Sequence, residues 1–131
     1  MNVIGLDGRN YHWKVKSKVR SNASKPHIRC RELLKQLFPL DQIIEEIYLP
    51  GAGKLYLDFY LPLRKLAIEV DGRQHVKYIP HFHGTKLNFF KSLRRDDKKR
   101  HWCELNNIIL IKLEQDEKDD DWRRKLSGRE N

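Results

Sequence analysis

The chain has 131 residues and a formal net charge of +9, which predicts binding to polyanions such as nucleic acid. This length fits one domain, and no apolar run approaches the roughly 20 residues that span a bilayer, so we expect no membrane partner. Two cysteines, Cys30 and Cys103, make no disulfide framework, and the N-terminus shows no signal segment, so a cytoplasmic, intracellular protein is expected.

The first 25 residues show no helical periodicity and are predicted to form a basic N-terminal arm (1–25) before the main domain (26–131). Residues 11–19 alternate basic and larger residues, which suits an extended arm or an edge strand. Tyr11 and Trp13 in this segment either stack on bases or pack on the domain. No acid occurs between residues 9 and 25, and four cations there are expected to bind nucleic acid: Lys14, Lys16, Lys18 and Arg20.

A helix is predicted to follow the arm, with Ser24 as its N-cap and Pro26 in its first turn. Its apolar side chains have the i, i+3, i+4, i+7, i+8 spacing of one helix face. They end before Pro39 and comprise Cys30, Leu33, Leu34, Leu37 and Phe38. His27 lies on the same side, where it either faces the functional site or has a structural role.

Three strands are predicted at residues 43–49, 54–61 and 65–71, and their short connections favour an antiparallel meander. Residues 76–84 are expected to form a loop. A long helix over 85–106, a buried strand over 108–113 and a short helix near Trp122 are predicted to follow. This order predicts a single α+β domain with a mixed, largely antiparallel central sheet flanked by helices.

Two of the predicted strands carry acids within otherwise apolar runs. Alternation places Glu69 and Asp71 on one face of the third strand, and Asp58 lies within reach on the preceding strand. An unpaired buried carboxylate is costly, and a cluster of three suits a hard cation such as Mg²⁺. His75, which follows a tight turn at Gly72, is placed to transfer a proton in phosphodiester cleavage. The sequence therefore predicts a metal site at Asp58, Glu69 and Asp71.

The same acids also have a purely structural interpretation. Asp58 would then cap a turn, and Glu69 would pair with a basic residue. Asp71 and Gly72 form a dipeptide that is common in hairpin turns. The order and spacing of all these residues together favour the metal site.

A second basic segment covers residues 86–100, on the long predicted helix. Helical spacing aligns part of it beside the acids, whereas Lys98, Lys99 and Arg100 are interpreted as a solvated face. The cations expected to hold phosphates are Lys86, Lys91, Arg94 and Arg95. Two basic segments that flank acidic strands favour a nucleic-acid groove.

The acids and the histidine occur in the order Asp58-Phe59, Glu69-Val70-Asp71-Gly72, His75. That order resembles the PD-(D/E)XK nuclease superfamily, closest to the branch of very-short-patch repair endonucleases and of phage and bacterial EDxHD endonucleases. The similarity covers roughly residues 43–113 and continues through Arg95-Asp96, Lys99, Trp102-Cys103 and Asn106-Asn107-Ile108. The resemblance implies a restriction-endonuclease-like core.

By position, the resemblance makes Asp58 a metal-binding acid and Glu69 the acid of the motif. It makes His75 the histidine of the branch and Asp96 the final acid, on the following helix. Asp71 stands where most superfamily members have a lysine. The usual cation beside the attacking water is therefore missing from that position.

The leading glutamate of the branch has two possible positions here. Glu32 points nearly opposite the apolar stripe of the first predicted helix, towards solvent. Glu46 lies on the strand before that of Asp58 and is preferred. The expected catalytic set is therefore Glu46, Asp58, Glu69, Asp71, His75 and Asp96.

These observations predict a Mg²⁺- or Mn²⁺-dependent endonuclease that hydrolyses phosphodiester bonds in DNA. The resemblance suggests a homing-type or mobile-element enzyme, encoded by a phage. The chain has no room for a separate recognition domain, so the arm, a homodimer or a targeting protein would supply specificity. The alternatives are a repair or junction-resolving nickase on the same fold and a noncatalytic nucleic-acid-binding module, which the missing lysine keeps open.

Overall fold

The computed structural model describes residues 1–72 and 86–128, without the side chains of residues 86–93. The predicted loop at 76–84 and His75 lie outside the described residues. The secondary structure confirms a single α+β domain. Its elements are β1 (Asn2–Ile4), β2 (Asn10–His12), α1 (Lys25–Leu37), β3 (Ile44–Tyr48), β4 (Tyr56–Leu61), the 3-10 turn η1 (Pro62–Arg64), β5 (Leu66–Asp71), α3 (Lys86–Leu105), β6 (Ile109–Glu114) and α4 (Asp119–Ser127).

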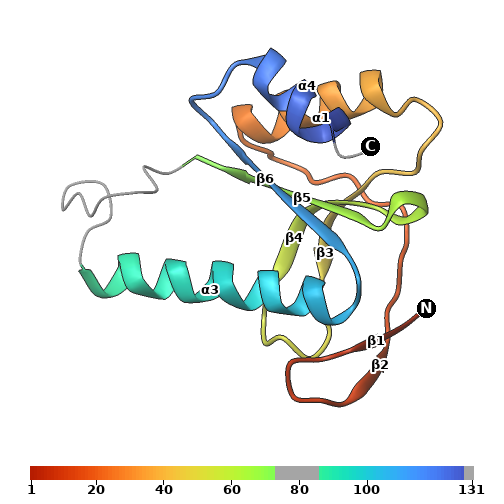
Figure 1. Cartoon of the computed structure of the whole chain (residues 1–131), viewed down its shortest axis with the longest axis vertical. Helices are drawn as coiled ribbons and strands as arrows, with labels where there is room; N and C mark the ends of the chain where they lie inside the picture. Colours follow the sequence, from red (N-terminus) through yellow and green to blue (C-terminus); the bar gives the residue numbers. More distant parts are fainter. Residues whose placement is uncertain (73–85, 129–131) are drawn as a thin grey trace.

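A four-stranded sheet in the order β3-β4-β5-β6 forms the centre of the fold (Figure 1). The pairs β3–β4 and β4–β5 are antiparallel, as the short connections between these strands predict. The pair β5–β6 is parallel, because the connection between them returns through α3. The prediction of a mixed, largely antiparallel sheet is therefore confirmed.

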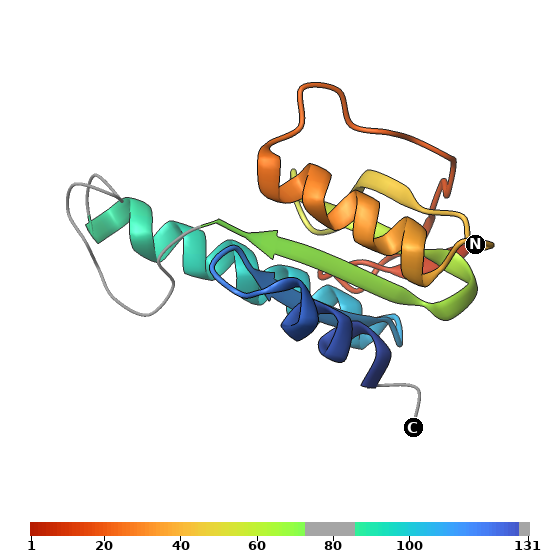
Figure 2. The same cartoon turned by 90° about the horizontal axis from the view of Figure 1, so that it is seen from above.

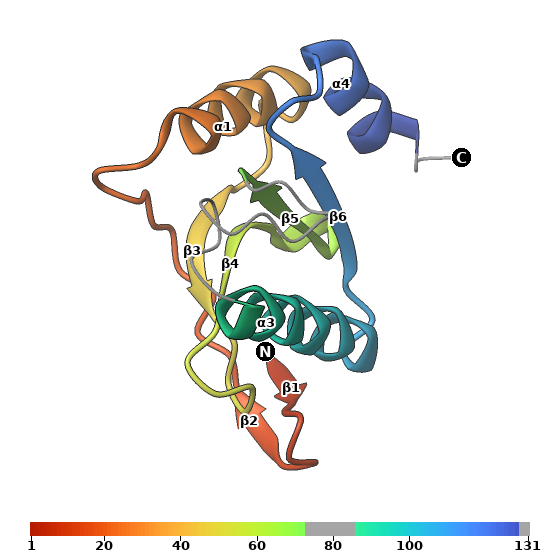
Figure 3. The same ribbon diagram turned by 90° about the vertical axis from the view of Figure 1, so that its left-hand side faces the viewer.

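Helices cover both faces of this sheet. Viewed along α3, Figure 3 shows α3 beneath the sheet and α1 with α4 above it. Seen from above in Figure 2, α1 and α4 lie over the same face, where Arg29 Nε donates to Asp119 Oδ1 at 2.7 Å. The Arg29 guanidinium also lies over the Trp122 ring at 3.7 Å. None of the helices within the described residues is long and apolar enough to cross a membrane.

The first helix follows the predicted capping pattern. Ser24 Oγ accepts a hydrogen bond from His27 N at 3.3 Å, and Pro26 lies in the first turn. The predicted apolar stripe points inward, since Cys30, Leu33 and Leu34 are buried. Together with α4, this face packs on β4, β5 and β6 and contributes to the core on that side of the sheet: Phe59, Leu61, Leu66, Ile68, Leu113, Trp122 and Leu126.

The N-terminal residues form part of the folded body. Strands β1 and β2 make a small antiparallel sheet, and Trp13 directly after it is only 2% exposed. Trp13 lies against Tyr60 and Trp102, with ring centroids 4.6 and 5.0 Å away, and its Nε1 donates to Tyr48 O at 2.7 Å. Trp13 therefore packs on the domain. The segment that follows it, residues 14–24, contains no helix or strand.

Removal of the Trp13 side chain is expected to destabilise the whole domain. Trp13→Ala leaves a cavity between Tyr60 and Trp102, and such truncations cost roughly 3–5 kcal/mol. Urea unfolding followed by circular dichroism measures the loss. Tyr56→Ala, which truncates an exposed aromatic residue, is the control and should cost about 0.5 kcal/mol. Equal stability of the two variants would contradict the role of Trp13 in the core.

Candidate functional site

The two central strands stop pairing regularly where their acids lie. The β4–β5 register runs from Leu61↔Leu66 to Phe59↔Ile68, so Asp58 and Glu69 face each other at the next level. There, side chains replace the backbone ladder. Asp58 N donates to Glu69 Oε2 at 2.7 Å, and Val70 N donates to Asp58 Oδ2 at 2.9 Å. Each carboxylate is thus held by a backbone amide of the opposite strand.

These acids line a hollow of about 280 Å³ between β4, β5, β6 and α3, named here the carboxylate hollow. Its lining contains four acids and three bases, which is a formal charge of −1 in a chain of +9. The hollow therefore brings together four of the six predicted catalytic residues and one predicted phosphate-binding cation, Arg95. The lining residues are Asp58, Glu69, Val70, Asp71, Arg95, Asp96, Lys99 and Lys112.

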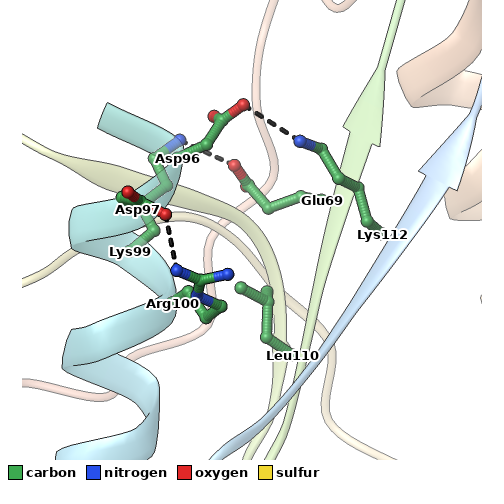
Figure 4. Close-up of a pocket in the computed structure, with 7 residues that line it drawn as sticks. All are labelled: Glu69, Asp96, Asp97, Lys99, Arg100, Leu110 and Lys112. Atoms are coloured by element: carbon green, nitrogen blue, oxygen red, sulfur yellow. Dashed lines mark hydrogen bonds and ion pairs between the residues drawn. The ribbon is translucent and has the colours of Figure 1, made fainter. Parts of the chain in front are cut away.

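Two lysines that the sequence did not assign to the site pair with these acids. Lys99 Nζ on α3 lies 2.6 Å from Glu69 Oε1. Lys112 Nζ on β6 lies 2.9 Å from Asp96 Oδ2 and 3.6 Å from Asp71 Oδ2. Figure 4 shows Glu69, Asp96 and both lysines converging between α3 and the sheet.

A larger hollow of about 500 Å³ adjoins the carboxylate hollow. The two share Glu69, Asp96, Lys99 and Lys112. Its remaining lining residues add an Asp97–Arg100 ion pair at 2.6 Å and the apolar side chain of Leu110 (Figure 4). The site is therefore a trough with a net negative part beside a part that is formally neutral.

The sequence does contain signals for both lysines. Lys112 is the single cation within the apolar strand Ile109–Glu114, which is the same signal that identified the acids in β4 and β5. It is paired with Glu69 in the parallel β5–β6 register. Lys99 follows Asp96 by three residues and so shares its helix face.

The environment of Glu69 favours its protonated form. Burial, and then the neighbouring charge of Asp58, raises the pKa of Glu69 to about 7, although Lys99 acts in the opposite direction. The carboxylates of Asp58 and Glu69 repel each other when both are ionised. A cation bound between them would relieve that repulsion.

The carboxylates of Asp58 and Glu69 are the two neighbouring oxygen donors that the hollow offers to a hard cation. Both oxygens of Glu69 have partners, Asp58 N at 2.7 Å and Lys99 Nζ at 2.6 Å. Among residues 1–72 and 86–128, no group of three or more His, Cys, Asp or Glu side chains is arranged to hold a metal ion. The third predicted ligand, Asp71, lies beside Lys112. Mg²⁺ is commonly held by one or two carboxylates, with water and substrate phosphate as further ligands. Asp58 and Glu69 match that chemistry.

Neither position considered for the leading glutamate lies in the carboxylate hollow. Glu46 is level with Asp58 on the neighbouring strand, but its φ is 50° and its carboxylate lies 3.4 Å from Arg20 Nε. Glu46 therefore lies apart from the acids of the hollow, and its catalytic role stays a prediction. Glu32 is exposed on α1 and lies 4.0 Å from Lys35 Nζ.

The predicted phosphate-binding cations divide between two places. Lys14, Lys16 and Lys18 are exposed on segment 14–24, and Arg20 is half-buried beside β3. On α3, Arg94 and Arg95 are exposed, and Arg95 lines the carboxylate hollow. Lys86 and Lys91 lie on the same helix, but their side chains are outside the described residues.

Glu45, a buried acid directly before Glu46, was not identified from the sequence. Its side chain points to the face of the sheet that α1 covers. Glu45 is 2% exposed and accepts hydrogen bonds from His27 Nε2, Arg31 Nε, Arg31 Nη2 and Arg20 N at 2.7–3.0 Å. The His27 ring stacks on Phe59 at 4.3 Å. His27 therefore has a structural role, outside the carboxylate hollow.

No protein-family model matches the chain, and no solved structure matches it. The chain is similar to viral proteins. It is 44% identical over 63 residues to Uncharacterized protein 307L of Invertebrate iridescent virus 6, which covers 48% of this chain and 32% of that protein. It is 41% identical over 66 residues to Uncharacterized protein 094L of Frog virus 3, covering 49% and 43%.

A longer match covers 98 residues of Uncharacterized protein 033L of Invertebrate iridescent virus 3, at 28% identity. It includes 72% of this chain and 50% of the viral protein. The chain therefore spans a third to a half of the length of these three relatives. The similarity relates the chain to viral proteins and assigns it no activity.

The Glu45 cluster should make stability depend on acid pH. Burial alone would raise the pKa of Glu45, but hydrogen bonds from Arg31, Arg20 N and His27 lower it to about 2. The unfolded chain takes up the proton near the ordinary value of 4.5. The contribution of Glu45, about 3 kcal/mol, is therefore present above pH 4.5 and lost as the pH falls towards 2.

Urea unfolding between about pH 6 and about pH 3 measures this dependence. Glu45→Gln should flatten the fall in unfolding free energy at acid pH relative to the wild type. Glu46→Gln is the control, because the Glu46 carboxylate, next to Glu45 in the chain, is half-exposed. This variant should keep the wild-type slope of unfolding free energy against pH. An unchanged slope in Glu45→Gln would contradict the assignment.

Proposed function

We propose that the chain is a metal-dependent DNA endonuclease whose scissile phosphate binds at the carboxylate hollow. The observation that carries the proposal is the interrupted pairing of β4 and β5, where Asp58 and Glu69 replace the ladder and form a net negative hollow in a strongly basic chain. The mutual repulsion of two acids has a cost, which a cation bound between them would offset. The resemblance to the PD-(D/E)XK superfamily supports the same function.

Each described side chain has a role in this proposal. Asp58 and Glu69 would hold Mg²⁺ or Mn²⁺, and a bound ion supplies charge stabilisation at the phosphate and a lower pKa for water. Lys99 would orient the Glu69 carboxylate, and Lys112 pairs with both Asp71 and Asp96. Lys99 and Lys112 also bring positive charge to the region where most superfamily members carry the motif lysine. His75 remains the candidate for proton transfer.

Two sets of cations are available to hold the DNA backbone. Segment 14–24 runs along the β3 edge of the sheet, where Lys18 O accepts from Glu45 N at 3.0 Å, and α3 lies beneath the sheet (Figure 3). DNA that reaches the carboxylate hollow would therefore meet Lys14, Lys16 and Lys18 on one side and Arg94 and Arg95 on the other. Contacts of this kind give affinity without sequence specificity.

One hollow of this kind cuts one strand, so a double-strand break would need a homodimer or two successive nicks. A targeting protein, or a part of a longer protein such as the viral relatives, would supply sequence specificity. The relatives are viral proteins, which is consistent with a virus-encoded protein. A repair or junction-resolving nickase and a noncatalytic binding module remain outcomes of the tests below.

A cleavage assay tests the enzymatic proposal directly. Purified protein with Mg²⁺ should nick or linearise supercoiled plasmid, and removal of the metal with EDTA should stop the reaction. Asp58→Asn should slow cleavage about 100-fold or more, because a metal ligand contributes several kcal/mol to the transition state. Asp120→Asn, which changes an exposed acid on α4, is the matched control and should cut at the wild-type rate.

The substrate panel should contain intact duplex, nicked and branched DNA. Binding without cleavage of any of them, with Mg²⁺ or Mn²⁺, would favour the noncatalytic module and reject the nuclease. Preference for branched DNA over intact duplex would favour the junction-resolving alternative.

DNA binding should depend on the lysines of segment 14–24. Replacement of Lys14, Lys16 and Lys18 by glutamine should lower the slope of log affinity against log salt by about 0.9 for each lysine that contacts a phosphate. Fluorescence anisotropy in EDTA measures binding separately from cleavage. The matched control replaces Lys25, Lys35 and Lys54 by glutamine, three lysines outside both sets. Equal slopes in the two triple variants would reject this part of the groove.

A further inference from the structure

Segment 14–24 has no helix or strand of its own, and Glu45 makes two of its hydrogen bonds with the folded body. Further contacts come from Val15, which packs on the core, and from Ser17, whose hydroxyl accepts from Gln42 Nε2 at 2.6 Å. Glu45 N donates to Lys18 O at 3.0 Å, and Glu45 Oε1 accepts from Arg20 N at 3.0 Å. Glu45 thus binds the segment through both its backbone and its carboxylate. A chain with several like charges repels itself, so such an anchor is needed to keep it in one path.

The anchor is itself held firmly by α1. Arg31 binds both carboxylate oxygens of Glu45, with Nε 2.7 Å from Oε2 and Nη2 2.8 Å from Oε1. Arg31 Nη2 also donates to Arg20 O at 3.0 Å, and His27 Nε2 lies 2.8 Å from Glu45 Oε1. The carboxylate therefore joins three elements, namely β3, α1 and the basic segment, at a point where its side chain is 3% exposed.

The anchor also lies close to the candidate site in the sheet. Glu45 pairs with Phe59, the residue after Asp58, in the β3–β4 register. The basic segment is therefore fixed at the level of the carboxylate hollow, with Lys14, Lys16 and Lys18 exposed to solvent. Burial of the Glu45 carboxylate has a desolvation cost. In return, the cluster holds the basic segment in one path, although the segment contains no helix or strand.

We propose that Glu45 is a positioning residue for DNA, which holds the basic segment in the path that meets the phosphates beside the carboxylate hollow. The inference rests on the proposed function, because it assigns the segment to the same substrate. A segment that is already ordered loses less conformational freedom on binding, and so binds more tightly. Glu45 touches neither the hollow nor the scissile bond and should affect affinity while leaving the chemical step unchanged.

Glu45→Gln tests this, because the amide keeps the size of the side chain but loses the two-point pairing with Arg31. We expect the Kd for DNA in EDTA to rise about ten-fold and the KM for plasmid cleavage to rise similarly, with kcat at saturating DNA unchanged. Arg29→Met is the matched control: it removes an α1 arginine that pairs with Asp119, Gln115 O and Glu117 O on the α4 side. Its Kd and KM should remain those of the wild type.

A double-mutant cycle separates positioning from general stability. In the variant with Lys14, Lys16 and Lys18 replaced by glutamine, addition of Glu45→Gln should weaken binding no further, because the positioned charges are gone. An additive loss would overturn the proposal, as would an unchanged Kd or a lower kcat in Glu45→Gln. Arg31→Lys, which keeps a cation beside Glu45, serves the same cycle if Glu45→Gln does not fold.

The cycle also separates this inference from the proposed function. If the wild type neither binds nor cuts DNA, the proposed function fails. If it binds and cuts DNA but Glu45→Gln behaves like the wild type, only the positioning role fails.

Discussion

Two carboxylates occupy the centre of the sheet, at the level where β4 and β5 would otherwise exchange backbone hydrogen bonds. Burial there has a large electrostatic cost, so every neighbouring group must supply compensation. The amides of Asp58 and Val70 supply hydrogen bonds, and Lys99 supplies a charge from α3. The compensation is partial, as the pKa of Glu69 near 7 indicates. The metal ion of the proposed function would complete this compensation.

Polar residues at this level extend across the full width of the sheet. Glu46 faces the position of Asp58 from β3, Glu69 is paired with Lys112 on β6, and Arg20 lies beside Glu46 at the β3 edge. Above and below this polar row the strands are apolar and pack against the helices. The row runs from the basic segment at the β3 edge to Lys112 on β6, and DNA bound as proposed would follow this row.

The sequence predicts much of this arrangement because local periodicity encodes it. Helical spacing predicted the buried face of α1, and strand alternation with the order of the meander predicted that Asp58, Glu69 and Asp71 come together. Asp96, on α3, was expected there only because of the family resemblance. The partners of these acids were not predictable in the same way. Lys112 meets Glu69 only through the parallel register of β5 and β6, and Lys99 does so only through the placement of α3. Both depend on long-range packing, which no local pattern contains.

The same limit applies to Glu46. Strict alternation assigns Glu46 and Asp58 to one face, but φ at Glu46 is 50° and its carboxylate pairs with Arg20. Glu45, paired with Phe59 in the register, points to the opposite face, where α1 buries it.

The parallel pairing of β5 with β6 requires one particular register between the two strands. A shift of β6 by one residue would place Ile111 or Leu113 opposite Glu69 and turn Lys112 to the other face, away from Asp71 and Asp96. Apolar residues flank Lys112 on both sides, so hydrophobic burial alone distinguishes the two registers poorly. The pairing of Lys112 with Asp71 and Asp96 makes the correct alignment electrostatically distinct. The ion pairs of Lys112 therefore favour the observed register of β6 against β5.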